Sequence, residues 1–286
     1  MQNIVLQNDR MQVQISPLGA ELKSAKCDST EYMWQGNELW DGTSPVLFPI
    51  CGRLLDGQYT LGAQTYEMDI HGFANTRLFT VERQTDTEAV FLLCSDAETK
   101  AVYPFDFELR VIYRLQGTKV TVIYDVKNTG EGDLYFSAGC HETYACPEGI
   151  DAYCVEFDQV ETFDITDLDV AFMTDRTLNI APSGKTLPLQ TATFRKIDSL
   201  VFPALVSRGL TLRNQAGSRA IRCEYPDFPY FLICNEPGCH FICLEPWAGL
   251  PDYSGQKVDF SQKAGMITLP AGQSKRLTHT FEILEA

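Results

Sequence analysis

Hydrophobic and polar residues alternate along short stretches of this chain, with the two-residue period that is typical of β-strands. The alternation is clearest over residues 107–115 and 277–283. The apolar run at residues 89–94 predicts a buried strand. Further strands are expected at residues 12–15, 119–126, 209–214, 220–224 and 231–234. The pattern therefore predicts a protein built almost wholly from strands.

Turn-forming residues separate these expected strands. Residues 116–118 and 128–133 carry the Gly and Asn residues that favour hairpin turns. Only residues 164–178 suggest a short helix, and no linker, repeat or low-complexity tract interrupts residues 1–286. We therefore expect a single domain over residues 1–286, an all-β sandwich with few short helices.

Composition narrows the classes of function. The 286 residues are 44% hydrophobic, enough for a substantial core, and the formal net charge is −15. This charge argues against binding to the phosphate backbone of nucleic acid or to an anionic membrane surface. The N-terminal residues do not resemble a secretory signal, and no apolar run reaches the roughly 18 residues of a membrane span. A cytoplasmic protein is expected.

Ten cysteines are spread along the chain, and a reducing compartment would keep them as thiols in the core. Cys234, Cys239, His240 and Cys243 are close enough in sequence to suggest a zinc site. In a strand, however, Cys239 and Cys243 would share one face and His240 would point to the other. One ion could not easily bind all three, so we expect no metal and no cofactor.

The segment 243–252 contains the residues that best suggest a reactive site. It places Glu245 and Trp247 at the end of an apolar run, just before a Gly/Pro turn. A strand here would deliver the Glu245 carboxylate to the rim of a cleft, and the Trp247 indole would offer a flat face of the kind on which sugar rings stack. The segment favours acid–base chemistry on a carbohydrate.

Few residues could complete such a site. His71 and His141 both lie near glycines, in segments where a histidine can face a ligand, and either could supply the acid. Arg53 also adjoins a glycine and could donate hydrogen bonds. The other two histidines, His240 and His279, are expected to be ordinary sheet or surface residues.

Five segments, in this order, resemble the aldose 1-epimerase (galactose mutarotase) family, and especially its LacX-like branch. The similarity covers nearly the whole chain. The segments are PVLFPICGRL at residues 45–54, HGFA at 71–74, VYPFDF at 102–107, GCH at 139–141 and LEPWAG at 244–249. Five motifs in the correct order are hard to explain by chance.

The resemblance implies a galactose mutarotase-like supersandwich that binds a monosaccharide in an open cleft and interconverts the α and β anomers of a free aldose without a cofactor. It makes Glu245 the general base and His141 the general acid. Arg53 and His71 would bind sugar hydroxyls and the ring region. Asp198 matches, less closely, a family aspartate that holds sugar hydroxyls.

The chain departs from the branch at two positions. Asn75 stands where a basic residue is common, and Glu142 stands where proline is common. A carbohydrate-binding protein without catalysis therefore stays open as an alternative. So does a glycoside-active enzyme that pairs Glu245 with Asp198 or Asp252. Epimerisation of a hexose 6-phosphate is disfavoured by Asn75. The charge of Glu142 would affect the preceding histidine only if the two side chains met, and adjacent strand residues usually point apart.

Overall fold

The computed structural model describes residues 2–284, which form an all-β architecture with two large sheets and few short helices. The nine-stranded sheet runs in spatial order through β18 (Gly184–Pro188), β15 (Tyr153–Glu161), β20 (Gly209–Asn214), β21 (Ala220–Glu224), β25 (Ser274–Leu284), β11 (Lys119–Asn128), β10 (Phe107–Gln116), β9 (Glu88–Cys94) and β8 (Thr80–Gln84). The eight-stranded sheet runs through β17 (Thr177–Asn179), β16 (Asp164–Thr166), β19 (Ser199–Phe202), β22 (Tyr230–Cys234), β23 (Phe241–Trp247), β13 (Gly139–Cys140) and β5 (Val46–Leu47), and β14 (Glu142–Ala145) also pairs with β23.

Smaller elements complete the fold. A four-stranded sheet contains β1 (Ile4–Gln7), β2 (Met11–Ser16), β3 (Glu21–Cys27) and β4 (Thr30–Glu31). Two strand pairs join β6 (Gln58–Leu61) to β7 (Gln64–Glu67) and β12 (Leu134–Phe136) to β24 (Ile267–Leu269). The helices are α1 (Ala97–Val102), α2 (Thr191–Phe194) and the 3-10 turns η1 (Leu55–Gly57), η2 (Ala74–Thr76), η3 (Ile150–Ala152) and η4 (Phe260–Gln262).

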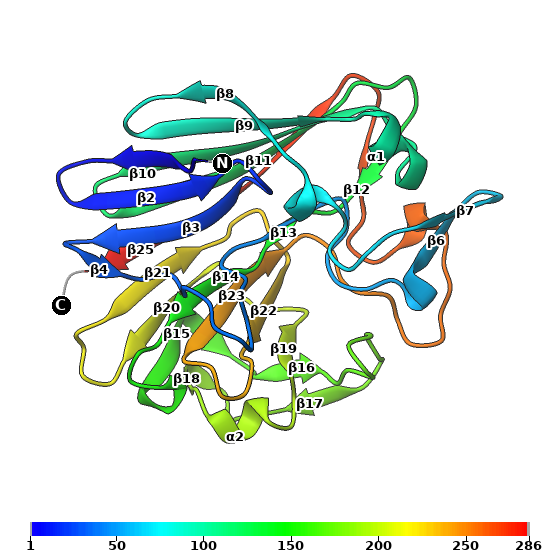
Figure 1. Ribbon diagram of the computed structural model, residues 1–286. Helices are drawn as coiled ribbons and strands as arrows, with labels where there is room; N and C mark the ends of the chain where they lie inside the picture. Colours follow the sequence, from blue (N-terminus) through cyan, green and yellow to red (C-terminus); the bar gives the residue numbers. More distant parts are fainter. Residues whose placement is uncertain (1, 285–286) are drawn as a thin grey trace.

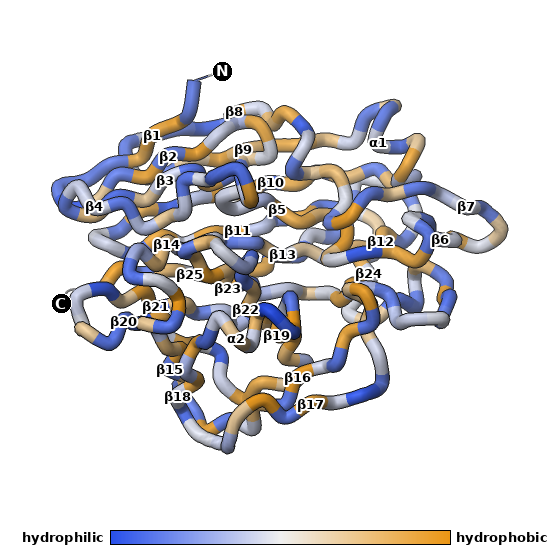
Figure 2. The backbone as a smooth tube through the Cα atoms, turned by 60° about the horizontal axis from the view of Figure 1, so that its bottom comes forward, coloured by the Kyte–Doolittle hydropathy of each residue, from blue (hydrophilic) through white to orange (hydrophobic). Residues whose placement is uncertain are grey.

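The core lies where the sheets face each other. Figure 1 shows β1–β4 beside β8–β11, and β14, β22 and β23 beside β15, β20 and β21. The Tyr113 hydroxyl on β10 donates a 2.8 Å hydrogen bond to the carbonyl of Ala20, which ties the four-stranded sheet to the nine-stranded one. Figure 2 shows hydrophobic and hydrophilic colour mixed along the strands. In β2 the side chains alternate between buried and half-buried, as the two-residue period requires.

Alternation along β23 separates the core from a second environment. Ile242 and Leu244 are buried in the main core, whereas Phe241, Cys243 and Trp247 belong to smaller apolar clusters on the other face. Side chains of β19 and β22 divide in the same way. One face of the eight-stranded sheet therefore packs in the core and the other forms the floor of a cleft.

The expected strands are present, but the short helix expected within residues 164–178 was wrong. That stretch holds β16 and the start of β17, which pair with each other in antiparallel register. Thr166 also pairs with Val201 of β19, and Ile165 is fully buried in the core. Pairing with strands distant in sequence decides this segment, because its own helical pattern is weak. None of the helices formed by residues 2–284 has the length and apolar character that crossing a membrane would require.

Candidate functional site

The centre of the cleft floor is a histidine and a carboxylate on neighbouring strands. β13 and β14 both pair with β23 in one continuous antiparallel register, and His141 joins β13 to β14. This register places His141 directly opposite Glu245. The Nε2 atom of His141 lies 3.5 Å from Oε2 of Glu245, and the two residues are 7% and 1% exposed. The structure therefore brings the expected acid and the expected base together.

Glu245 lies in surroundings that disfavour its charge. Burial raises the pKa of its carboxyl well above the usual range, the nearby His141 lowers it in part, and Cys234 raises it further. Its Oε2 atom has no hydrogen-bond partner among the described residues. Such a carboxylate binds a proton more strongly than an exposed glutamate does, which suits a general base.

His71 is held against the cleft by the backbone beside Arg53. The Nδ1 atom of the His71 ring accepts a 3.1 Å hydrogen bond from the backbone N–H of Gly52, and the backbone N–H of His71 donates to the Gly52 carbonyl. Burial lowers the pKa of His71 to about 3, and the nearby His141 and Arg53 lower it further. The ring therefore stays neutral at physiological pH with its proton on Nε2, where it can donate to a ligand oxygen.

The loop that carries His71 depends on a close backbone approach. His71 has φ +65°, and Gly72 follows with φ +79°. A Cβ atom on Gly72 would lie 2.2 Å from the carbonyl oxygen of Phe48. Only glycine fits this position without a shift of the backbone, so the glycine of the HGFA motif has a structural reason.

Aromatic rings surround the two histidines. Trp247 contacts His71 edge-on, with ring centroids 5.4 Å apart, and its Nε1 donates a 3.1 Å hydrogen bond to the carbonyl of Cys140. Trp247 is only 4% exposed, so its face is largely covered by packing, and stacking on a sugar stays a prediction. Trp40 stacks on His141 at 5.2 Å and also lines the cleft. Sequence reasoning missed Trp40, because it lies in a long loop before β5 without a strand pattern.

The cleft around these residues occupies about 990 Å³, measured out to open solvent. All six expected site residues line it: Arg53, His71, His141, Asp198, Glu245 and Trp247. Arg53 and Asp198 are exposed and form no ion pair among the described residues, so both are free to bind a ligand. Glu236 adds a further carboxylate to the lining.

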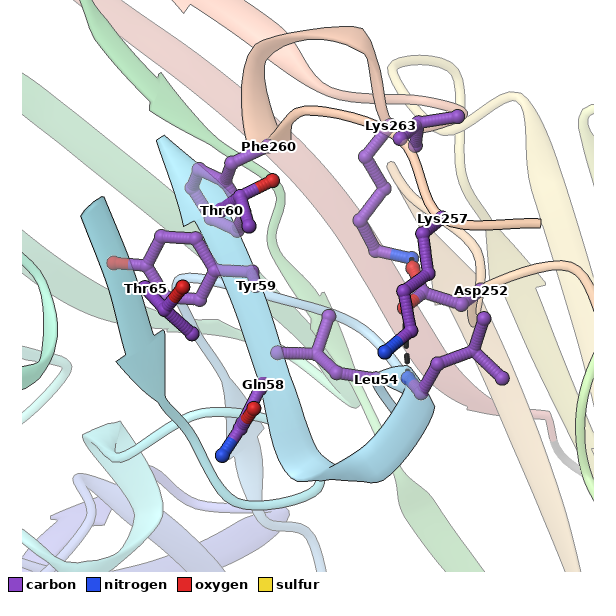
Figure 3. Close-up of a pocket in the computed structure, with 11 residues that line it drawn as sticks. Leu54, Gln58, Tyr59, Thr60, Thr65, Asp252, Lys257, Phe260 and Lys263 are labelled. Carbon is purple, nitrogen blue, oxygen red and sulfur yellow. Dashed lines mark hydrogen bonds and ion pairs between the residues drawn. The ribbon is translucent and has the colours of Figure 1, made fainter. Parts of the chain in front are cut away.

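Asp252 faces a different pocket. Its Oδ1 accepts a 2.6 Å hydrogen bond from Lys263 Nζ, and its Oδ2 accepts one of 2.8 Å from the Leu55 N–H (Figure 3). The backbone N–H of Asp252 also donates to the carbonyl of Arg53. Asp252 therefore supports the loop that carries Arg53 and is not part of the cleft lining around Glu245.

A second histidine–carboxylate pair lies on the opposite face of the strand. His279 on β25 is fully buried, and its Nε2 lies 2.8 Å from Oε1 of Glu142. The other carboxylate oxygen of Glu142, Oε2, accepts a 2.6 Å hydrogen bond from the Tyr144 hydroxyl. His279 is a sheet residue but not a surface residue. Its burial together with Glu142 is tolerated because a buried polar group is stabilised by a hydrogen-bonding partner. Glu142 and His141 point to opposite faces, as alternation predicts.

The cysteine cluster of the sequence is divided in the structure. Cys239 precedes β23 and contacts Asn37, and His240 is exposed. Cys234 and Cys243, in contrast, stand opposite each other on β22 and β23, close to Glu245. The ten cysteines all lie within the described residues 2–284 and are thiols, not disulfides.

Fold and site together define a large β-sandwich protein with an imidazole–carboxylate pair in an open cleft. The chain belongs to the aldose 1-epimerase family, whose sequence pattern matches residues 2–199. It is 33% identical over 264 residues to the plasmid-encoded protein LacX of Lactococcus lactis subsp. lactis. The aligned region covers 86% of this chain and 88% of LacX.

Two solved structures extend the comparison across β23 and β25. A galactose mutarotase related enzyme from Lactobacillus acidophilus superposes with a TM-score of 0.93 at 30% identity, covering 99% of this chain and 97% of its own. A galactose mutarotase-like protein from Lactobacillus casei ATCC 334 gives the same TM-score and identity, covering 99% and 100%. The galactose mutarotase-like sandwich expected from the sequence is confirmed.

Proposed function

We propose that this protein is an aldose 1-epimerase that interconverts the α and β anomers of a free, uncharged aldose. Glu245 removes the proton from the C1 hydroxyl while His141, as the imidazolium, gives a proton to the ring oxygen. Rotation about the C1–C2 bond and reversal of both transfers close the ring with the other anomer. Arg53, His71 and Asp198 hold the sugar hydroxyls and the ring region during these steps.

The separation of 3.5 Å between His141 Nε2 and Glu245 Oε2 carries this proposal. The C1 hydroxyl and the ring oxygen are bonded to the same carbon, so an acid and a base that serve both must lie close together. Retaining and inverting glycosidases instead use two carboxyl groups at least roughly 5 Å apart on either side of the bond. The position of Asp252 in another pocket removes one of the two carboxylates available for that alternative.

The charges in the cleft favour a neutral sugar. Its lining holds Arg53 and, in the proposed mechanism, the His141 imidazolium as cations, against the carboxyls of Asp198, Glu236 and Glu245. Asn75, at the position where a basic residue is common, is not among the lining residues. A sugar phosphate would meet more negative than positive groups, and its binding would be opposed.

A polarimetric time course of freshly dissolved α-D-glucose and α-D-galactose tests the proposal. We expect the protein to accelerate mutarotation, and we expect Glu245→Gln and His141→Asn each to lower the rate at least about 100-fold, because each removes one proton-transfer group. His240→Asn, which changes an exposed histidine, serves as the control and should leave the rate unchanged.

The same experiment distinguishes the alternative of a non-catalytic carbohydrate-binding protein. In that case, addition of sugar would quench the tryptophan fluorescence of the protein, and the protein would not change the rate of mutarotation. Near-normal rates in Glu245→Gln or in His141→Asn would remove that residue from the mechanism.

A further inference from the structure

Two thiols lie beside the acid–base pair without a role in anomer interconversion. Cys234 on β22 stands opposite Cys243 on β23, and on the same two strands Leu232 stands opposite Glu245. Cys243 is fully buried, whereas Cys234 is half-buried and lines the cleft. The thiols are therefore placed between the cleft and the interior, within reach of Glu245.

Four different ligand atoms converge at this point. One ligand atom from each of His141, Cys234, Cys243 and Glu245 lies within 4.8 Å of all the others. Zinc bonds of about 2.0–2.3 Å in tetrahedral geometry place ligand atoms roughly 3.3–3.8 Å apart, so a pair at the 4.8 Å limit would have to close by about 1.0–1.5 Å. The distance between His141 Nε2 and Glu245 Oε2 is already 3.5 Å.

The state of Glu245 is an independent indication of a ligand. Its Oε2 atom is buried, has no hydrogen-bond partner among the described residues, and lies in this cluster. The Trp40 ring stacks on His141 and restricts the imidazole. The half-buried position of Cys234 gives an ion a route from the cleft.

We propose that Cys234, Cys243, His141 and Glu245 bind one soft divalent cation, of the class of Zn²⁺, and that the bound ion blocks the acid–base pair. Two thiolates with one imidazole and one carboxylate form a ligand set that suits Zn²⁺ and its analogue Cd²⁺ and disfavours Mg²⁺ or Ca²⁺. On binding, both thiols release their protons to solvent, as do His141 where it is the imidazolium and Glu245 where it is protonated, so that two thiolates, a neutral imidazole and a carboxylate face the ion; no electron is transferred. The ion site stands on geometry alone, whereas its inhibitory effect rests on the proposed function.

Titration of the reduced, full-length protein with Cd²⁺ tests the site. The measurements are the thiolate-to-cadmium charge-transfer absorption in the ultraviolet and the heat of binding. We expect one ion per chain, and we expect Cys234→Ser and Cys243→Ser each to weaken binding about 100-fold or more, because each removes one of four ligands. Cys94→Ser, which removes an exposed thiol elsewhere, is the matched control and should bind as the unaltered protein does.

Failure of each part gives a distinct result. No stoichiometric binding, or binding that survives both Cys234→Ser and Cys243→Ser, would overturn the ion site whatever the catalytic activity. Thermal unfolding in the absence of metal checks that each variant is folded, and His141→Asn provides a third ligand variant that leaves both thiols in place. Stoichiometric Zn²⁺ should also stop mutarotation until a chelator is added. Zn²⁺ binding without loss of measured activity would contradict the proposal that the bound ion blocks the acid–base pair.

Discussion

At the scale of single residues, the main feature of the site is a glutamate whose charged form is disfavoured by burial. Glu245 is 1% exposed, and burial raises its pKa well above the usual range. The sequence could predict that Glu245 ends a strand near a turn. It could not predict the depth of burial, because that depends on Leu232 and His141 on the neighbouring strands.

Replacing this carboxyl should stabilise the fold while it slows the proposed reaction. A raised folded-state pKa means that the folded protein holds the Glu245 proton more tightly than the unfolded chain does. The associated stability is complete below the unfolded pKa, near 4.3, and is lost as pH rises through the folded pKa. Glu245→Gln should therefore exceed the unaltered protein in free energy of unfolding at neutral pH, by about 0.5–2 kcal/mol.

Urea unfolding between pH 4 and pH 8 measures this difference. The advantage of Glu245→Gln should grow as pH rises, whereas Glu131→Gln, in an exposed turn, should show no comparable trend. An advantage that is absent at pH 8, or that shrinks as pH rises, would show that the charge of Glu245 is not destabilising.

At the scale of elements, the loop containing His71 shows how backbone geometry positions the imidazole that we propose to bind the sugar. His71 and Gly72 both have positive φ, and the N–H of Phe48 donates to the carbonyl of His71. The loop is therefore fixed against the segment that leads to Arg53. A substitution at Gly72 that shifts the backbone would displace the His71 imidazole.

Two glycine substitutions separate close approach from conformational preference. Gly117→Ala, in the open turn between β10 and β11 with φ +58°, should lower stability by about 1–2 kcal/mol from its left-handed backbone alone. Gly72→Ala should cost about 3 kcal/mol or more, because it adds a clash with the Phe48 carbonyl, and should also weaken sugar binding. Chemical denaturation and sugar titration measure the two effects. Equal costs at the two positions would contradict the role given to the Phe48 contact.

The sequence predicted most long strands but not every partner. β10, β11 and β25 alternate cleanly and were expected, because local sequence carries their period. β16 was missed because its pairing partner β19 lies about 35 residues later. The burial of His279 was also missed, since its carboxylate partner is more than a hundred residues away in the chain.

At the scale of the whole molecule, the large negative net charge has no direct part in the proposed reaction. The net charge is −15, but the proposed reaction depends on a local proton exchange with a neutral sugar. The site assembles from segments near residues 53, 71, 141, 198 and 245. The resemblance to a known family predicted their convergence. Periodicity alone could not, because distances between strands are set by the sheet topology.

A neutral substrate should make the reaction nearly independent of salt. Raising KCl from about 0.05 to 0.5 M shortens the screening length severalfold, yet kcat/KM for the aldose should change less than about twofold, because no charge steers the encounter. Polarimetry at several salt concentrations measures this. A steep change with salt would indicate a charged substrate and would count against the proposed one.

The place of β25 in the large sheet has a consequence for synthesis. β25 alone joins β11 to β21, so the two parts of the nine-stranded sheet meet only through residues 274–284. While the chain is still emerging from the ribosome, β11 and β21 each present an unpaired edge, and Glu142 lacks its partner His279. Unpaired edges are templates for association with other chains. The growing chain should thus be more prone to association before β25 is released than after β25 has joined β11 to β21.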